Sequence, residues 1–472
     1  MRSTDFISIL PLLVISIFSV LVMLGIAAYR SHRTAFLLTL VGEVIAFALI
    51  PLSLSVAPRQ VTSLLIADRY SLIFTGLLLA GSIAVAFLAY GYLEKRSEEK
   101  EEFYVLLLLA TLGSMVLASS THFFSLFVGL EILSVSLYIM IAYLATERQP
   151  LEAGLKYLIL AGASAAFLVF GMALVYAETG TMEFSRIASV VDHPTLLLLA
   201  GFALIVSGIG FKLALVPFHM WTPDVYQGAP APVGAFVATV SKGAVFALLL
   251  RYFVQTNAYA HRPLFLILAG VSVASMITGN FLALMQTNLK RILAYSSIAH
   301  LGYLFVAFLA SRDLAVPASS YYLVAYFISI LAAFGVISVL SPGDADTETL
   351  EEYQGLFWRR PWLAMVLSAS MFSLAGIPLT AGFVGKFYVL AAGVGSAQWL
   401  LVVVLVITSA IGLFYYLRVI VALYTAPSPV LEEKSQGVAW VGNIALIGLM
   451  VLLIWFGVYP ASIMRLIQSA AL

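Results

Sequence analysis

GFKLALVPFHMWTPDVYQGAPAPV, residues 210–233, decides the fold of this chain, because it interrupts an apolar helical pattern inside a long hydrophobic region. Each proline removes a backbone donor and clashes with the preceding helical turn. Lipid cannot satisfy the carbonyl groups that such a break leaves free, so broken membrane helices occur only where they face protein or a water-filled cavity. The stretch therefore predicts an interrupted membrane helix that faces a bundle interior. Its prolines are Pro217, Pro223, Pro230 and Pro232.

A second interrupted stretch, SLAGIPLTAGFVGKFYVL at residues 373–390, lies five spans further along. Paired interrupted spans at matching places in two halves of a chain indicate internal repeats around a transport path. The two halves are not visibly alike in sequence, so the repeat is inferred from the layout. The residues that break the second stretch are Gly376, Pro378, Gly382 and Gly385.

The composition predicts a membrane protein with many spans. Of 472 residues, 62% are hydrophobic and 10% are charged, whereas a soluble domain carries roughly 25% charged residues. The net charge of +1 gives no electrostatic support for nucleic-acid binding. The chain has no cysteine, which excludes thiolate-held iron–sulfur clusters, disulfides and cysteine-bearing zinc sites.

Fourteen stretches are long and apolar enough to cross a bilayer as helices, and the first is predicted to be retained rather than cleaved as a signal. The longer polar connections are too short for a separate domain, so residues 1–472 are predicted to form a single integral membrane domain. Twelve of the twenty lysines and arginines outside the spans lie on the side of the first loop, which places both termini outside the cytoplasm. The spans begin near residues 6, 35, 70, 103, 123, 152, 195, 230, 264, 291, 318, 362, 398 and 437.

Five ionisable residues lie within these apolar stretches: Glu131, Lys156, Lys212, Lys242 and Lys386. A charge at the bilayer centre costs roughly 2.5–3.5 kcal/mol on insertion scales, so such residues usually serve ion or proton movement. Lys156 lies close to the start of its predicted helix, so its amine could instead reach the membrane interface. Glu131 is predicted to pair with Lys212, because burial and a nearby opposite charge shift each pKa in opposite directions and make the pair a switchable proton site.

Histidines and other acids give weaker signals. His219 in the first break and His300 in the tenth span are candidates for a proton relay, although His300 could equally be a structural, hydrogen-bonded residue. Glu43 lies in the middle of the second span without an evident role, and Asp224 is predicted to cap the short helix after the first break. No role is assigned to His32, His122, His193 and His261.

Together these segments resemble the antiporter-like subunits of the proton-pumping NADH:quinone oxidoreductase, respiratory complex I, with the N type as the nearest match. The resemblance runs from about residue 100 to 425. Lysine at 386 fits the N type better than the M type, which usually has glutamate there, and the chain lacks the long lateral helix of the L type. The segments that carry the resemblance are GLEILSVSLY (129–138), EAGLKYLIL (152–160), residues 210–233, SKGAVF (241–246), QTNLKRILAYSSIAHLGY (286–303), EEYQGLFWRRP (351–361) and residues 373–390.

The resemblance implies an all-α fold of fourteen helices with broken seventh and twelfth helices. It implies two inverted five-helix repeats, residues 103–254 and 264–424, flanked by helices within 6–93 and 437–458. It also implies a polar axis across the middle of the membrane. That axis runs from Glu131 and Lys212 through Lys242 to Lys386.

The predicted function is that of a proton-translocating subunit of the membrane arm, in the inner membrane of a bacterium. It would hold no cofactor, while NADH, FMN, iron–sulfur clusters and quinone act elsewhere in the complex, and its neighbours would be K-type and M-type subunits. The alternative is a subunit of a multi-subunit cation/proton antiporter, which partners without redox centres would indicate. A structural scaffold is the third interpretation, and it predicts that replacing the lysines abolishes assembly rather than pumping.

Overall fold

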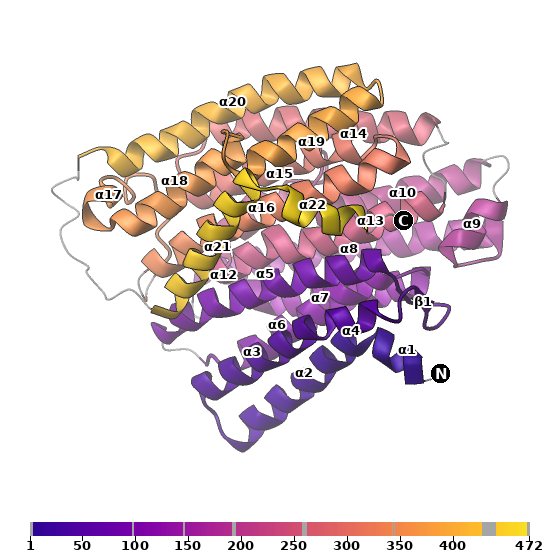
Figure 1. The fold of residues 1–472 in the computed structure, drawn as a ribbon, viewed down its shortest axis with the longest axis horizontal. Helices are drawn as coiled ribbons and strands as arrows, with labels where there is room; N and C mark the ends of the chain where they lie inside the picture. The colour runs from indigo at the N-terminus through magenta and orange to yellow at the C-terminus, as the bar shows by residue number, and fades with distance from the viewer. Residues whose placement is uncertain are drawn as a thin grey trace.

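The computed structural model describes residues 3–469 except 97–98, 145–146, 191–194, 257–261, 342, 344 and 427–439. Its helices lie side by side in one body, with α2 and α3 at one edge and α20 at the opposite edge (Figure 1). In the described part of the chain, thirteen helices are long and apolar enough to cross a membrane, and two shorter apolar helices follow one another at Pro361–Ala375 and Ala381–Gly395. The all-α polytopic fold is confirmed, and the twelfth predicted span consists of these two short helices.

The N-terminal part includes a small antiparallel hairpin of β1 (Arg59–Gln60) and β2 (Ile66–Ala67), in which Arg59 pairs with Ala67. Its helices are α1 (Ser3–Ser8), α2 (Leu10–Ala28), α3 (His32–Ala48), α4 (Ile50–Leu54), α5 (Arg69–Glu94), α6 (Glu102–Ser119), α7 (Phe123–Ile141), α8 (Arg148–Thr179) and α9 (Phe184–Val190).

The rest of the chain is helical apart from its connections. The middle elements are α10 (Leu196–Leu213), α11 (Trp221–Gly228), α12 (Ala231–Phe236), the π-helical turn η1 (Val237–Ser241), α13 (Lys242–Gln255), α14 (Arg262–Leu284), α15 (Leu289–Phe308) and α16 (Arg312–Leu340). The last are α17 (Leu356–Arg359), α18 (Pro361–Ala375), α19 (Ala381–Gly395), α20 (Trp399–Tyr424), α21 (Trp440–Val458) and α22 (Ala461–Gln468).

The centre of the bundle is formed by the span of α12, η1 and α13 together with α15 and α16. The most apolar part of the span Ala231–Gln255 is 100% buried, whereas that of the first span, Leu10–Ala28, is only 22% buried. Without water in the hydrocarbon layer, outer helices need apolar surfaces and inner helices can carry polar groups. The charged residues of the central helices are therefore shielded from lipid by a ring of other helices.

Both predicted breaks are present, and protein groups bind the carbonyls that they free. Helix α10 ends before Ala214, which adopts a left-handed conformation with φ 60°. Beyond the gap the indole Nε1 of Trp221 donates to the Phe211 carbonyl at 2.9 Å. Helix α18 ends at Gly376, with φ 85°, and Thr380 caps the start of α19 by accepting from the Phe383 amide. Both interruptions are thus well-defined turns whose backbone groups are hydrogen-bonded, and not frayed helix ends.

Glycines let the helices approach closely at equivalent places in the two predicted repeats. A Cβ on Gly113 of α6 would lie 2.6 Å from the Leu133 nitrogen of α7, and one on Gly279 of α14 would lie 2.6 Å from the Ala299 nitrogen of α15. Small residues at such contacts are what allows membrane helices to pack. Both contacts join the first two helices of a predicted repeat, yet the inverted repeat itself stays a prediction.

Gly382 provides a test of the second break. A Cβ at this position would lie 1.9 Å from the Ser373 carbonyl oxygen, so Gly382→Ala should force α19 away from the end of α18. Overpacking of this kind costs about 1–3 kcal/mol or more. We expect less assembled protein in the membrane and a lower Tm of the purified complex, measured by blue-native electrophoresis and thermal scanning.

The matched control is Gly448→Ala in α21, where an added Cβ would meet nothing within 4 Å. That substitution should leave both the yield and the Tm unchanged. Equal behaviour of the two variants would contradict the packing of the second break.

Candidate functional site

Lys212 lies in the last turn of α10, just before the first break, and only 4% of its surface is exposed. Its Nζ donates to Ser134 Oγ of α7 at 2.7 Å and lies 5.3 Å from the centre of the Tyr157 ring. A buried ammonium that binds a hydroxyl and an aromatic face keeps its polar contacts without a carboxylate. The break positions this lysine, because the chain turns away directly after it.

Glu131 lies about one helical turn before Ser134 on α7, the serine that accepts from Lys212. Among the residues that the structure describes, no direct ion pair joins these two side chains, and Glu131 Oε1 is buried without a hydrogen-bond partner. A buried carboxylate oxygen without a partner is costly. The predicted pairing of Glu131 with Lys212 therefore stays a prediction, and Ser134 receives the hydrogen bond that the sequence assigned to the acid.

Lys242 is the first residue of α13, directly after the π-helical turn, and it is 1% exposed. Its Nζ donates to Ser297 Oγ of α15 at 2.7 Å and lies 5.3 Å from the centre of the Tyr226 ring. Tyr326 of α16 donates to the same serine oxygen at 2.7 Å. A π-helical turn inserts a residue and rotates the side chains after it, so η1 sets the direction of Lys242. Ser297 becomes a shared acceptor that joins three helices.

His300 lies one turn after Ser297 on α15, with both ring nitrogens engaged. Nδ1 is 2.6 Å from the Tyr322 hydroxyl, and Nε2 is 3.0 Å from the Tyr416 hydroxyl. Tyr416 in turn is 2.5 Å from Ser296 Oγ. This arrangement is a continuous row of hydroxyl and imidazole groups, which can pass a proton by exchanging donor and acceptor roles. The same contacts also fit a purely structural histidine, so the relay stays a prediction.

Lys386 of α19 lies at the second break and is 8% exposed. Its Nζ donates at 2.8 Å both to the Ala375 carbonyl, at the end of α18, and to Ser409 Oγ of α20. It lies 5.4 Å from the centre of the Tyr303 ring, whose centre is 5.5 Å from that of His300. A cavity of about 280 Å³ at the break is lined by Lys386 and Ser409. The ring of Tyr303 thus lies between this lysine and His300.

The remaining predicted residues lie away from this row. Lys156 is exposed and forms ion pairs of 2.9 Å with Glu152 and with Asp224, as an interfacial lysine would. The predicted capping role of Asp224 is wrong, since α11 already begins at Trp221 and Asp224 accepts from Lys156 and Arg291. His219 is buried, and within the described residues its Nδ1 has no hydrogen-bond partner.

Glu43 is fully buried in the N-terminal bundle, apart from the lysines. Its Oε1 is hydrogen-bonded to Ser82 of α5, which also lies 2.7 Å from Thr111 Oγ1 of α6. Its Oε2 has no partner among the described residues. The carboxyl group therefore joins three helices through hydroxyls. His193 and His261 lie outside the described residues.

The serines and tyrosines that hold the lysines were not predicted from the sequence. Each is distant in the chain from its lysine, and single hydroxyl residues are common in membrane helices. One local signal existed, because Ser296, Ser297 and His300 share a face of α15 at helical spacing. The side chains missed at the lysines are Ser134, Ser297, Ser409, Tyr157, Tyr226 and Tyr303. Those missed around Ser297 and His300 are Tyr322, Tyr326 and Tyr416.

An ion pair at the opposite end of α13 fixes the helix that carries Lys242. Both Nη atoms of Arg251, which is 0% exposed, donate to Asp68 at 2.7 and 2.8 Å. Asp68 also caps α5 by accepting from the Ser71 amide. Burial alone would raise the pKa of Asp68, but the hydrogen bonds and charge of Arg251 lower it below its ordinary 3.8. The carboxylate form therefore stabilises the folded protein.

Asp68→Asn should lower the Tm at neutral pH, since removing one partner of a buried pair costs about 3–5 kcal/mol. Because the folded pKa is lowered, the contribution of Asp68 is complete above pH 3.8 and is lost as the pH falls through the folded value. Thermal scans of the purified complex should show the difference from wild type shrinking in that acidic range. A difference in Tm that stays constant as the pH falls through that acidic range would contradict the charge-based account.

Paired interrupted spans with buried charged groups at the breaks are typical of transporter folds. The comparisons with known proteins identify the family. Residues 120–412 match the family described as NADH:quinone oxidoreductase/Mrp antiporter, TM, and the chain belongs to this family.

Relatives in sequence are named NADH-quinone oxidoreductase subunit N. The relative from Ectopseudomonas mendocina is 49% identical over 99% of this chain and 96% of its own length. The relative from Methylococcus capsulatus is 50% identical over 88% of this chain and 86% of its own length. The resemblance to N-type subunits is therefore confirmed. The chain is accordingly a multi-pass bacterial membrane protein.

Solved structures agree. A chain of respiratory complex I from Thermus thermophilus with bound aureothin matches with a TM-score of 0.84 and 34% identity, over 97% of this chain and 99% of that chain. A chain of the Mrp complex from Dietzia sp. matches with a TM-score of 0.87 and 19% identity, over 100% of this chain and 97% of that chain. At that identity the second match speaks for the fold alone. The first match is a chain of a respiratory complex, in agreement with the membrane-arm partners predicted for this one.

Proposed function

We propose that this chain is an N-type subunit of the membrane arm of NADH-quinone oxidoreductase and moves protons across the membrane. It holds no redox centre of its own, and NADH oxidation and quinone reduction take place on other subunits. Its neighbours are the K-type and M-type subunits. The relatives named subunit N, which match nearly the whole chain, support this assignment.

Within this function, Lys212, Lys242 and Lys386 carry the proton, with His300 and its tyrosines between the last two. One observation carries the proposal: each of these buried lysines donates to a serine hydroxyl, at 2.7, 2.7 and 2.8 Å. A carboxylate partner would be left as an uncompensated buried charge whenever its lysine gave up a proton. A neutral hydroxyl can donate or accept, so it suits both the charged and the neutral amine.

Control of the path would lie at Glu131. A structural change at the quinone end alters the distance from Glu131 to Lys212, and a nearby carboxylate favours the charged form of the lysine. Withdrawal of the acid releases the proton towards Lys242. Lys156 and His219 lie at the first break and its surface, and they are further candidates for the proton path.

The two repeats, residues 103–254 and 264–424, would each supply one break and one half of the path. The matched glycine contacts of α6 with α7 and of α14 with α15 support this division. Residues 6–93 and 437–458 flank the repeats within one integral membrane domain.

Glu131→Ala and Lys212→Ala should each abolish or sharply reduce proton pumping while the complex still assembles. The measurement is acidification of inverted membrane vesicles during NADH oxidation, with complex content determined in parallel. Lys100→Ala serves as control, because this lysine donates to the Glu94 carbonyl in a loop outside the spans. Pumping at the wild-type level in both variants would sink the proposal, and loss of assembly in both would favour the scaffold interpretation.

Ser297→Ala should lower the number of protons pumped per NADH oxidised, because Lys242 loses its acceptor and Tyr326 loses the same partner. Ser338→Ala is the matched control, since Ser338 is equally buried and bonds only to the Phe334 carbonyl of its own helix in the described structure. The ratio is obtained by recording NADH absorbance and a pH-sensitive dye in one vesicle preparation. Equal ratios for the two variants would remove Ser297 from the path.

The second candidate function is a subunit of a cation/proton antiporter, which the match in fold to the Mrp complex keeps open. Affinity purification from the native membrane separates the two. Flavin and iron–sulfur absorption in the purified complex supports the oxidoreductase, whereas small membrane partners without redox centres support the antiporter.

A further inference from the structure

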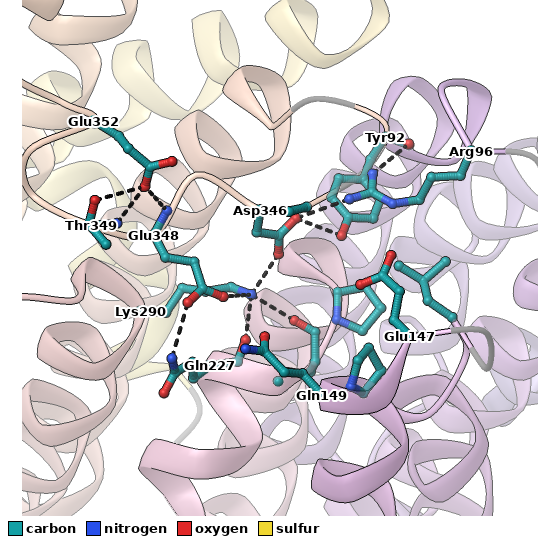
Figure 2. A pocket seen from close by; sticks show the side chains of 16 residues that line it. Tyr92, Arg96, Glu147, Gln149, Gln227, Lys290, Asp346, Glu348, Thr349 and Glu352 are labelled. Carbon is teal, nitrogen blue, oxygen red and sulfur yellow. Dashed lines mark hydrogen bonds and ion pairs between the residues drawn. The ribbon is translucent and has the colours of Figure 1, made fainter. Parts of the chain in front are cut away.

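A second polar centre lies on the side of the first loop, where α5 and α11 end and α15 begins. It borders a cavity of about 430 Å³. Figure 2 shows Lys290 and Asp346 facing each other beside this cavity, with Tyr92 and Arg96 to the right of Asp346 and Gln227 below Lys290. This centre lies outside the row of lysines described above.

Lys290, the second residue of α15, is 1% exposed and binds the end of α11. Its Nζ donates to the Gln227 carbonyl at 2.8 Å and to the Ala229 carbonyl at 2.9 Å. The last carbonyls of a helix have no partner within it, and Pro230, which follows α11, has no N–H to supply. The ammonium of Lys290 therefore takes the place of the missing donors and closes the C-terminal end of α11.

Asp346 holds Lys290 in this position from the connection between α16 and α17. Its Oδ2 lies 2.6 Å from Lys290 Nζ, while its Oδ1 accepts from Arg96 at 3.2 Å and from the Tyr92 hydroxyl at 2.7 Å. The side chain of Asp346 is 5% exposed. Burial alone would raise its pKa, but Lys290 and Arg96 lower it below the ordinary range, so the carboxylate is charged at neutral pH.

Helix α11 connects this centre with the buried lysine of the central span. Tyr226 lies in its last turn, with its hydroxyl 3.3 Å from Ser297 Oγ and its ring centre 5.3 Å from Lys242 Nζ. A shift of the α11 end changes both contacts, because Tyr226 comes directly before Gln227. The Lys290 ammonium thus binds Gln227, and the neighbouring residue Tyr226 contacts Ser297 and Lys242.

The neighbouring cavity lowers the cost of separating Lys290 from Asp346, because water can enter it. A water occupies about 30 Å³ in the liquid, so the cavity of about 430 Å³ has room for roughly fourteen of them. Its rim is acidic, with Glu147, Glu348 and Glu352 among the lining residues. An ammonium or carboxylate that leaves its partner can be hydrated there instead of remaining unpaired in an apolar interior.

We propose that Lys290 and Asp346 are positioning residues for Lys242: their contact holds the end of α11, and through Tyr226 it sets the Ser297–Lys242 hydrogen bond. Movement of the α16–α17 connection that withdraws Asp346 loosens α11 and changes the surroundings of Lys242. The inference rests on the proposed function, because it assigns these residues an effect on proton transfer.

The experiment uses the whole purified complex with Lys290→Met, Lys290→Arg, Asp346→Asn and the control Lys100→Met. The first readout is hydrogen exchange of the backbone amides between residues 221 and 234. Loss of a buried hydrogen-bonded charge should speed exchange by roughly tenfold or more in Lys290→Met and Asp346→Asn. Lys290→Arg, which keeps a charged donor, should show a smaller increase, and Lys100→Met should match wild type.

The second readout is the number of protons pumped per NADH, compared in wild-type and Tyr226→Phe backgrounds. Asp346→Asn should lower this ratio in the wild-type background and add little in Tyr226→Phe, because both changes act through one contact. Additive losses would overturn the route through Tyr226. Faster exchange with an unchanged ratio would overturn the positioning role while leaving the proposed function intact.

The proposed function fails separately if Lys242→Ala pumps normally. If Lys290→Met does not assemble, Asp346→Asn and Lys290→Arg still decide the inference by the same two readouts. Exchange rates equal to wild type in Asp346→Asn would overturn it outright.

Discussion

Every backbone carbonyl in the interior of this bundle needs a partner, and that requirement governs the arrangement of its charged groups. Two membrane helices are broken, and lipid offers no hydrogen bonds to the groups that the breaks expose. The protein supplies them from side chains: Trp221 to the end of α10, Lys290 to the end of α11 and Lys386 to the end of α18. Two of these three donors are lysines, so charge and interruption occur together.

The same groups make the interior polar while the central helices stay buried. The central helices are almost completely buried, and their lysines bind hydroxyls, carbonyls and aromatic faces. Aromatic faces and hydroxyls are weaker partners for a cation than a carboxylate, which leaves the amines able to change their state. Carboxylates are used instead where position has to be fixed, as with Asp68 on Arg251 and Asp346 on Lys290.

The sequence predicted the spans and both breaks, since these depend on local properties, namely apolar length and the placement of proline and glycine. It also predicted that Lys212, Lys242 and Lys386 are buried. It could not predict their partners, because Ser297 meets Lys242 only through the packing of two helices 55 residues apart in the chain. The position of Lys290 near a span end predicts a loop cation, yet this lysine is buried, because the α16–α17 connection folds back over it with Asp346.

The likeness of the three lysine environments has a thermodynamic consequence. If these lysines carry protons as proposed, amines that are each held by a serine have similar proton affinities, so the row itself has little preference for one direction of transfer. Under the proposed function, the direction of transport would then be set from outside the row, by what the neighbouring subunits impose on its first and last lysines. Such a row would conduct protons backwards as readily as forwards when the imposed gradient is reversed.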